Sequence, residues 1–411
     1  IFLFFFAAGT RLAPLFNAKA AKWVSGRKNI FPRLKDAIGS GQRVIWMHCS
    51  SLGEFEQGRP VLEALREKHP GYKILLTFFS PSGYEVRKDY KGADWVFYLP
   101  MDGPRNAGRF LDIVQPELVI FVKYEFWFYY LKKVAYRKIP LLLISARFYE
   151  GAFFFRWYGS IGRKMLSRFD HIFIQDPLSL QLLQTHGLST NASLCGDTRF
   201  DRVLKIASEA GSIPGLDAFV KDHFVIVAGS TWPDDEKGLA NAISQLSDLP
   251  LKLIIAPHEI DVSHLNSIET MFPGAIRFSS MQREDERKKV LIIDNIGMLS
   301  RLYQYAGLTY VGGGYNRSGI HNVLEAAVYD KIVLFGPNHE SFNEAVGLIK
   351  AGGAFVINEP GHDGVQLAGM IRKLYEDEAL RNAGSLAAGG FVHAQSGATE
   401  KILHYIQEKR L

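Results

Sequence analysis

Short apolar runs alternate with helix-like segments along most of this 411-residue chain. The runs lie at 44–49, 73–78, 95–98, 118–122, 141–145 and 171–174, and again at 224–228, 253–256, 290–293, 308–311, 332–335 and 354–357. Such runs, separated by polar or helical stretches, are typical of parallel strands that helices cover on both faces. A linker-like stretch, Ser208–Gly215, interrupts the rhythm. The sequence therefore predicts an α/β protein with two doubly wound, Rossmann-like domains that face each other across a cleft.

The same pattern predicts the domain boundaries. We expect a basic N-terminal segment over 1–42, a first Rossmann-like domain over 43–205, a second over 218–395 and a C-terminal helix over 396–411. In open parallel sheets, ligands bind outside the carboxyl ends of the strands. The loops that follow the predicted strands are therefore where chemistry is expected.

The positive charge is concentrated at one end of the chain. Its formal net charge is +6, and residues 1–43 hold eight basic residues against one acid, so the remainder is near neutral. This distribution excludes a generic nucleic-acid coat, and no nucleic-acid partner is expected. An apolar stretch, Ile1–Gly9, is followed by Arg11, Lys19 and Lys22, a combination that suits an anionic membrane surface.

The first residues leave two interpretations open. Ile1–Gly9 is too short to cross a bilayer, and the chain begins without Met, which suggests that something upstream is missing. The stretch is either a truncated signal or buried strand, or the tail of an anchor or interfacial segment. We favour the second interpretation because basic residues follow it.

Cysteine and histidine usage argues against a metal or disulfide framework. Cys49 and Cys195 are too few for a disulfide scaffold or a four-cysteine zinc site, and we expect both as reduced core residues. His258 and His264 flank Asp261, but we do not expect a metal there. No Asp-x-Asp triplet occurs, which argues against a divalent metal bridging a nucleotide-sugar diphosphate.

The loop after the first predicted strand carries a candidate base. Ser51 and Gly53 let the backbone turn sharply into a helix, and Glu54 falls in the first turn of that helix, where the helix dipole favours an ionised carboxylate. Glu54 is either a general base or a capping carboxylate. Glu56 and Arg59 could form a surface pair.

Lys123 and Glu125 follow the 118–122 run. They could orient a sugar or form an exposed ion pair, and the sequence leaves both alternatives open.

The strongest local signal is the glycine-rich stretch Gly312–Glu325, which follows a strand and is predicted to open a helix. Glycines permit close backbone approach, and free N–H groups at a helix start bind anions such as phosphate. Glu325, one turn into that helix, could accept hydrogen bonds from ribose hydroxyls. The stretch lacks the P-loop pattern, which argues against NTP hydrolysis. The alternative is a glycine-rich turn with a core histidine.

Two further loops point to the same edge of the second domain. Gly229–Trp232, with Glu236, offers amides and hydroxyls, and Asp294–Leu299 offers a helix start led by a glycine. Either loop alone could be plain helix capping.

Taken together, these motifs resemble the bacterial lipid A Kdo transferases, which move 3-deoxy-D-manno-octulosonic acid (Kdo) from a CMP-linked donor. The matching stretches run in the same order: Trp46–Glu54, Tyr124–Trp127, Gly196–Asp201, Gly229–Thr231, Asp294–Leu299, Gly312–Glu325 and Val333–Pro337. The resemblance implies a GT-B type glycosyltransferase that is inverting, independent of metal and without a cofactor. It also implies a reaction at the cytoplasmic face of the bacterial inner membrane, with the protein N-terminally anchored or peripheral.

The resemblance implies residue roles as well. Glu54 would deprotonate the acceptor hydroxyl, and Glu125 and Arg199 would help stabilise the transition state. The second domain would bind CMP-Kdo through Ser230, Thr231, Pro257, His258, Gly297, Met298, Leu299, Gly313, Gly314, His321, Asn322 and Glu325. The first domain would meet the lipid A precursor (lipid IVA) and the membrane through Arg27, Lys28, Arg33, Ser51, Gly53 and Arg59.

Two positions depart from the family's pattern. The family commonly has Pro-Arg-His where this chain has Pro257-His258-Glu259, so the contact of that arginine must come from elsewhere or be weaker. Arg199 stands where the pattern usually has Lys, whose geometry differs. Two alternatives remain: another GT-B nucleotide-sugar enzyme, such as a UDP-sugar transferase or epimerase, and a non-enzymatic, peripheral membrane-binding protein.

Overall fold

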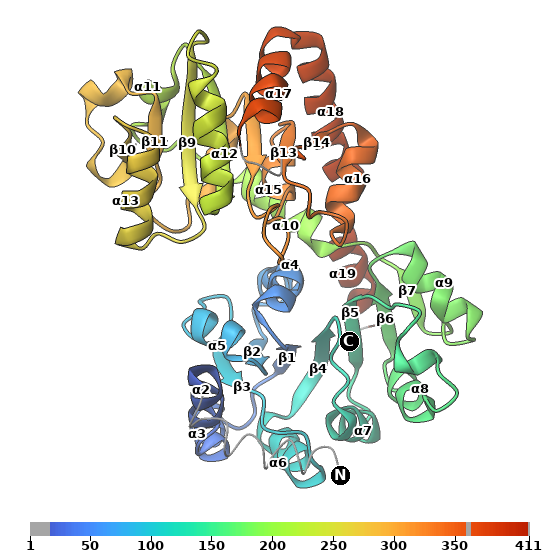
Figure 1. Cartoon of the computed structure of the whole chain (residues 1–411). Coiled ribbons are helices and arrows are strands. Elements are labelled where there is room, and N and C mark those ends of the chain that lie inside the picture. Colours follow the sequence, from blue (N-terminus) through green and yellow to red (C-terminus); the bar gives the residue numbers. More distant parts are fainter. Residues whose placement is uncertain (1–16, 359–362, 410–411) are drawn as a thin grey trace. The chain divides into compact units, whose positions relative to one another are not determined.

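The computed structural model describes residues 17–358 and 363–409, and the chain divides into two compact units (Figure 1). Unit 1 comprises Ile1–Asp201 and Ser396–Leu411, and unit 2 comprises Arg202–Gln395. The predicted apolar stretch Ile1–Gly9 and Arg11 lie outside the described residues. Each unit contains a seven-stranded sheet in which the paired strands run parallel, so the predicted α/β, doubly wound fold class is confirmed.

Unit 1 is built on a sheet of strand order β3-β2-β1-β4-β5-β6-β7. Its strands are β1 (Val44–Cys49), β2 (Lys73–Phe78), β3 (Trp95–Tyr98), β4 (Pro116–Val122), β5 (Leu141–Ala146), β6 (His171–Ile174) and β7 (Ala192–Leu194). The apolar runs predicted the first six. The seventh was missed because β7 is a three-residue edge strand without a fully buried residue.

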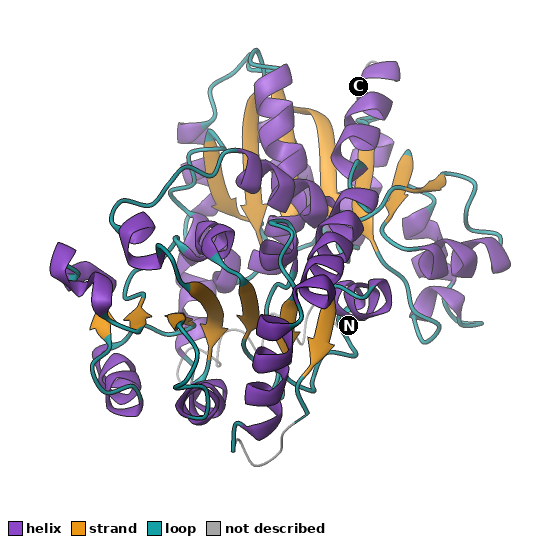
Figure 2. Cartoon of the chain, turned by 90° about the horizontal axis from the view of Figure 1, so that it is seen from above, coloured by secondary structure: helices purple, strands orange, loops and turns teal. Residues whose placement is uncertain are grey.

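Helices cover both faces of this sheet (Figure 2). They are α2 (Ala18–Gly26), α3 (Ile30–Ala37), α4 (Leu52–Lys68), α5 (Pro81–Arg87), α6 (Pro104–Val114), α7 (Phe128–Tyr136), η2 (Phe153–Phe155), α8 (Ser160–Leu166), α9 (Pro177–Thr185) and α19 (Ala398–Glu408). Neighbouring residues of β1 belong to opposite clusters, Trp46 to the one with α3 and α6 and Met47 to the one with α4 and α19. This burial on both faces explains why the strands read as continuous apolar runs.

The C-terminal helix α19 packs in unit 1, on the same face of the sheet as α4. The carboxylate of Asp201 accepts hydrogen bonds from the amides of Gly397 and Thr399, both at 2.6 Å, and the Cys195 thiol donates to the carbonyl of Ala398 at 3.1 Å. The chain therefore returns to its first unit after completing the second. Cys49 and Cys195 are buried and free of a disulfide, as predicted.

Unit 2 repeats the architecture with the strand order β10-β11-β9-β8-β12-β13-β14. Its strands are β8 (Phe224–Thr231), β9 (Leu251–Pro257), β10 (Ile276–Arg277), β11 (Val290–Ile292), β12 (Leu308–Val311), β13 (Val333–Phe335) and β14 (Ala354–Val356). Its helices are α11 (Leu216–Val220), α12 (Pro233–Ser244), α13 (Val262–Met271), η3 (Phe278–Ser280), η4 (Arg283–Arg287), α14 (Leu299–Leu302), η5 (Tyr303–Tyr305), α15 (Leu324–Ala327), α16 (Asn343–Ala351), α17 (Val365–Glu376) and α18 (Glu378–Ala394). Helix α10 (Thr198–Ser208) runs from unit 1 into unit 2.

One local expectation for unit 2 was wrong. Strand β8 continues to Thr231, so Gly229 and Ser230 lie in the strand and not in a loop. The helices predicted to open after the glycine-rich stretch and after Gly297 are present, each as a single turn of four residues, α15 and α14. Helix α15 ends early because the chain turns at Asp330, whose φ is 55°, to enter β13.

Candidate active site

Each sheet has a point where its strand order reverses, and the candidate residues gather there. In unit 1 this point lies between β1 and β4, and in unit 2 it lies between β8 and β12. Loops that leave two such strands in opposite directions form a crevice at the carboxyl edge of the sheet. Glu54 and Glu125 follow β1 and β4, while Trp232 and the glycine-rich stretch follow β8 and β12.

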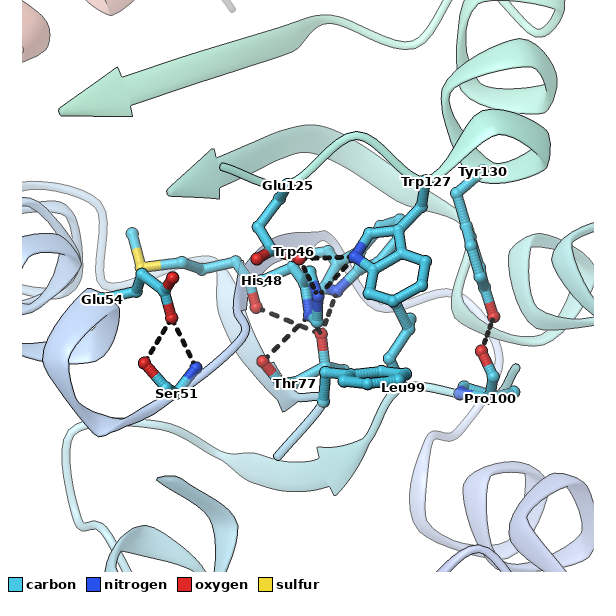
Figure 3. Close-up of polar contacts among 12 residues, drawn as sticks. Trp46, His48, Ser51, Glu54, Thr77, Leu99, Pro100, Glu125, Trp127 and Tyr130 are labelled. Carbon is cyan, nitrogen blue, oxygen red and sulfur yellow. Dashed lines mark hydrogen bonds and ion pairs between the residues drawn. The ribbon is translucent and has the colours of Figure 1, made fainter. Parts of the chain in front are cut away.

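Glu54 is fixed through one of its two carboxylate oxygens (Figure 3). Its Oε2 atom accepts hydrogen bonds from the backbone amide of Ser51 at 2.6 Å and from the Ser51 hydroxyl at 2.5 Å. The other oxygen makes no hydrogen bond with the described residues. The carboxylate thus caps helix α4 and still has one oxygen that can take a proton. Capping and general-base catalysis are therefore compatible in the same side chain.

Glu125 is buried, with 3% of its surface exposed, so it is not part of an exposed ion pair with Lys123. Its carboxylate lies 2.9 Å from Nε2 of His48, a fully buried side chain, and accepts a hydrogen bond from Nε1 of Trp127 (Figure 3). Burial of a carboxylate requires such partners, because an unpaired buried charge is strongly destabilising.

A chain of hydrogen bonds holds His48 from its other side. Nε1 of Trp46 donates to Oγ1 of Thr77 at 2.8 Å, and the same oxygen lies 2.8 Å from Nδ1 of His48. Because Thr77 accepts from Trp46, its own proton can be donated to Nδ1, which leaves the His48 proton on Nε2, facing Glu125. Nδ1 also lies 3.1 Å from the carbonyl oxygen of Thr77, and Nε1 of Trp127 lies 3.1 Å from Nε2. The proton on Nε2 orients the Glu125 carboxylate, 2.9 Å away.

Arg199 is held by the residue two positions before it. Its guanidinium donates to Oδ2 of Asp197 from Nε at 2.9 Å and from Nη2 at 2.7 Å. Asp197 Oδ1 also accepts from the backbone amide of Arg199 at 2.9 Å, and these charge-assisted bonds together fix the cation next to the start of α10. Burial lowers the pKa of Lys123, and the positive charge of Arg199 lowers it further while Glu54 opposes the shift. Lys123, Arg199 and Glu54 therefore share one electrostatic neighbourhood in unit 1.

The residues predicted to meet the lipid acceptor divide into two kinds. Arg27 is used inside unit 1: its guanidinium donates to the carbonyls of Leu99, Phe79 and Trp23, at 2.8, 2.8 and 3.1 Å. Burial lowers its pKa to about 9. These contacts fasten α2 to the ends of β2 and β3, and Arg27 is primarily a structural residue.

Lys28 and Arg33 are exposed, although Arg33 also donates to the carbonyl of Gly26 at 3.0 Å. Arg59 is paired with Glu63 at 2.8 Å and lies 3.6 Å from Glu56, which bears out the surface pair predicted within α4. Gly53 is exposed in the first turn of that helix.

In unit 2, three aromatic rings stack at the switch point. The ring centroids of His258 and His321 are 4.4 Å apart, those of Trp232 and His258 are 4.7 Å apart, and Nε1 of Trp232 donates to Nε2 of His321 at 2.9 Å. Burial, with the charge of His258 adding to it, lowers the pKa of His321 to about 4. His321 is therefore neutral near pH 7, as its role as acceptor requires.

The glycine-rich stretch is held by Asp235, a buried carboxylate that the sequence did not single out. Asp235 accepts hydrogen bonds from the amide of Gly313 at 2.8 Å, from the amide of Trp232 at 2.9 Å and from the hydroxyl of Tyr310 at 2.8 Å. A Cβ on Gly314 would lie 2.5 Å from Cα of Gly336, so a larger residue does not fit there. The Gly313 amide is already bonded, which reduces the number of free N–H groups expected of this stretch.

The remaining residues predicted to bind CMP-Kdo lie in or beside β8, β9, α14 and α15 of unit 2. Asn322 donates from Nδ2 to Glu325 at 3.1 Å, and its Oδ1 accepts from the amide of Leu324. Thr231 is buried and donates to Glu236 at 2.9 Å, and Met298 is buried next to α14. The other positions named from sequence are distributed around these elements: Ser230 and Pro257 in β8 and β9, and Gly297 and Leu299 beside or in α14.

The histidines considered for metal binding point to different partners. Nε2 of His264 lies 2.9 Å from Glu236 and its Nδ1 lies 2.9 Å from the carbonyl of Glu259, while Asp261 caps α13 and His258 joins the aromatic stack. Within residues 17–358 and 363–409, no group of three His, Cys, Asp or Glu side chains could hold a metal ion.

Sequence reasoning missed His48, Thr77 and Asp235. The available signal was a polar residue inside or directly after an apolar strand: His48 interrupts β1 and Thr77 interrupts β2. Such residues are buried only when they have hydrogen-bond partners.

Known structures share this architecture. The chain is similar to UDP-GlcNAc 2-epimerase from Neisseria meningitidis, solved with UDP-GlcNAc bound, at a TM-score of 0.61 and 16% identity, over 89% of this chain and 100% of that one. At this identity the likeness concerns the fold alone. Two parallel Rossmann-like units of this kind define the GT-B type of glycosyltransferase fold.

Sequence relatives then specify the family. Residues 26–202 match the model of the 3-deoxy-D-manno-octulosonic-acid transferase family. A 3-deoxy-D-manno-octulosonic acid transferase from Aquifex aeolicus is 28% identical over 80% of this chain and 85% of its own length, and that from Haemophilus influenzae is 26% identical over 83% and 82%. Residues 26–202 therefore form a Kdo transferase family domain, and the relatives that match over most of the chain are Kdo transferases, the class of glycosyltransferase that its motifs indicated.

Proposed function

We propose that this protein transfers Kdo from CMP-Kdo to a lipid A precursor, lipid IVA, in lipopolysaccharide biosynthesis, with inversion and without a metal. The observation that carries the proposal is Glu54. Its carboxylate lies at the switch point of unit 1, with one oxygen held by Ser51 and the other without a hydrogen bond to the described residues.

The proposed reaction requires the protein to position the two substrates, to accept a proton and to offset negative charge. The acceptor hydroxyl gives its proton to Glu54, its oxygen forms a bond to the anomeric carbon of Kdo, and the bond from that carbon to the CMP phosphate breaks. CMP leaves with the bonding electrons, so the site needs to position both substrates and offset negative charge. Arg199, fixed by Asp197, supplies a placed cation, and Glu125 is oriented by His48.

We assign CMP-Kdo to the carboxyl edge of unit 2. The stacked rings of Trp232, His258 and His321 offer a flat surface there, and Asp235 holds the glycine-rich stretch beside it. The family's arginine is missing at His258, and neutral His321 does not replace its charge. In this proposal the phosphate contact therefore comes from backbone amides of unit 2.

The acceptor is a lipid, so we place the enzyme at the cytoplasmic face of the inner membrane. Support comes from the exposed cations Lys28 and Arg33 and from Lys19 and Lys22 on α2. In the described part of the chain, no helix has the length and apolar character needed to cross a bilayer.

Mass spectrometry of the lipid product tests the proposal directly. Incubation with CMP-Kdo and lipid IVA should add at least one Kdo residue, and the Glu54→Ala variant should fold yet yield little product. A folded Glu54→Ala protein with full activity would remove the base assignment.

The sequence leaves a second candidate, another GT-B enzyme that acts on a UDP-sugar. Thermal shift separates the two, because the proposal predicts stabilisation by CMP. Stabilisation by UDP alone would favour the second candidate.

A further inference from the structure

An exposed aromatic surface lies on unit 1 in the segment between β5 and β6; Figure 1 shows α8, the α-helix of that segment. The surface consists of five side chains whose exposed fractions range from 42% to 90%: Tyr149, Phe153, Trp157, Tyr158 and Ile161. Isolated exposed apolar residues are normal on soluble proteins, but these five fall between residues 149 and 161, and the rings of Trp157 and Tyr158 lie 5.5 Å apart, a grouping typical of an interaction site.

The backbone beneath the aromatic surface is fixed. Phe154 is buried in the core, and its ring packs against Phe126 with centroids 4.7 Å apart. The guanidinium of Arg163 donates to the carbonyls of Phe154 and Arg156, at 3.0 and 2.9 Å. Trp157 therefore projects from a packed scaffold, at 90% exposure.

The surface is also basic. Residues 147–168 contain five Arg or Lys side chains and one acid, Glu150. Arg156 and Lys164 are exposed, and neither forms an ion pair with a described residue. This second concentration of positive charge is separate in sequence from the basic N-terminal segment.

The aromatic surface begins at the edge of the sheet that carries the candidate base. It follows the carboxyl end of β5, while Glu54 and Glu125 follow the carboxyl ends of β1 and β4. Burial raises the pKa of the Tyr124 phenol, Arg147 opposes the shift, and Tyr149 and Glu54 both add to it, so Tyr124 lies within electrostatic range of the surface and of the candidate base. Phe126, next to Glu125, packs on the scaffold of the surface.

We infer that this aromatic surface docks unit 1 on an anionic lipid bilayer, with Trp157 and Tyr158 in the headgroup region and Arg156 and Lys164 against lipid phosphates. Amphipathic Trp and Tyr rings favour the membrane–water interface, and cations near it are attracted to anionic lipids. A second copy of the chain would bring a like-charged surface, which opposes pairing. The inference does not require the proposed reaction, because docking is measured without donor or acceptor.

A single-cysteine probe reads insertion at this surface directly. Cys49 and Cys195 are buried, so the Trp157→Cys variant offers one exposed thiol for an environment-sensitive fluorophore. Tyr136→Cys is the matched control, since Tyr136 is 84% exposed at the end of α7 in the same unit. Adding phosphatidylglycerol vesicles should shift the emission of the label at position 157 to the blue and leave the label at position 136 unchanged.

The response of the label to vesicles of different composition tests the inference. Phosphatidylcholine vesicles should give a much smaller shift than phosphatidylglycerol vesicles. Co-sedimentation with phosphatidylglycerol vesicles while the label at position 157 stays unchanged would overturn the inference, because another segment would then hold the protein. A shift that depends on protein concentration without vesicles would also overturn it, in favour of self-association.

Two variants with an intact N-terminal segment measure the contribution of the surface. Trp157→Ala with Tyr158→Ala should weaken binding to phosphatidylglycerol vesicles roughly tenfold, whereas Tyr136→Ala should not. Arg156→Gln with Lys164→Gln should also weaken it roughly tenfold and lower its salt dependence. Lys132→Gln with Lys350→Gln removes the same charge from exposed positions elsewhere. Equal losses in both pairs of charge variants would mean that only net charge matters, and would overturn the assigned surface.

Discussion

The Nε2 atom of His48, at the end of β1, lies 2.9 Å from a carboxylate oxygen of Glu125, just after β4. Both side chains are buried, and they are partners because β1 and β4 are neighbours in the sheet. Glu54, also after β1, is on the same edge. The candidate base therefore lies at the same sheet edge as Glu125, a carboxylate that hydrogen bonds hold in one orientation.

The Glu54→Gln variant distinguishes catalysis from capping. The amide oxygen of Gln can still accept from Ser51, so the melting temperature should change little, but Gln cannot take a proton. We expect transfer activity to fall by about 10²–10⁴-fold. Activity close to that of the wild type, measured by product formation, would leave Glu54 only its capping role.

His48 is predicted to act by positioning Glu125. His48→Phe removes the donor to Glu125, and kcat should fall roughly 10–100-fold while KM for the donor changes little. His48→Gln keeps an amide donor and should recover much of the activity. Both variants should be less stable by about 1–3 kcal/mol, because a hydrogen bond in the buried network is lost. Equal kcat values for the two variants would indicate a purely structural histidine.

Arg27→Lys should destabilise unit 1 although it keeps the charge. One ammonium group cannot reproduce the fork that reaches the carbonyls of Leu99, Phe79 and Trp23, so we expect a loss of about 1–3 kcal/mol in urea unfolding. Arg33→Lys is the control, because Arg33 is exposed and makes one such bond; its effect should stay within about 0.5 kcal/mol. Similar unfolding curves for both variants would contradict the structural role.

His321 should make stability depend on pH. Its pKa is about 4 in the folded protein and 6.5 ordinarily, so between these values the unfolded chain binds more protons. The contribution is complete above about pH 6.5 and is lost as pH falls toward 4. His321→Gln keeps an acceptor for Trp232 but does not titrate. Its melting temperature should therefore fall less between pH 7 and pH 4.5, and parallel curves for the two proteins would refute the assignment.

Both thiols should be unreactive in the folded protein. Burial raises the pKa of Cys195 to about 12 and that of Cys49 well above its ordinary value, so neither forms the reactive thiolate near pH 8. With a chromogenic disulfide reagent, we expect no rapid reaction in buffer and two thiols in denaturant. Fast reaction of either thiol in buffer would contradict the burial.

Much of the fold could be predicted because the signal is local. Buried parallel strands read as apolar runs, and the runs predicted β1 to β6 within a few residues. The short strands β7 and β10 were not predicted, because two or three residues are too few to show a periodic pattern. The starts of the one-turn helices α14 and α15 were predicted but their lengths were not, because a glycine marks a possible helix start and not how far the helix continues.

Site residues could also be predicted only where neighbours along the chain determine their position. The position of Glu54 in the first turn of α4 could be predicted, because Ser51 and Glu54 are three residues apart in the chain. The partner of Glu125 could not be predicted, because it depends on which strand lies beside β4. Nor could the sequence separate Arg27, bound to carbonyls, from Lys28, which is exposed.

The sequence by itself determined the two α/β units, the ordered family motifs and a carboxylate at the start of a helix, because each is encoded by residues close together in the chain. Only the tertiary structure decided that His48 holds Glu125, that Asp235 holds the glycine-rich stretch and that Trp157 projects into solvent. These depend on strand order and on burial, which residues far apart in the sequence set jointly.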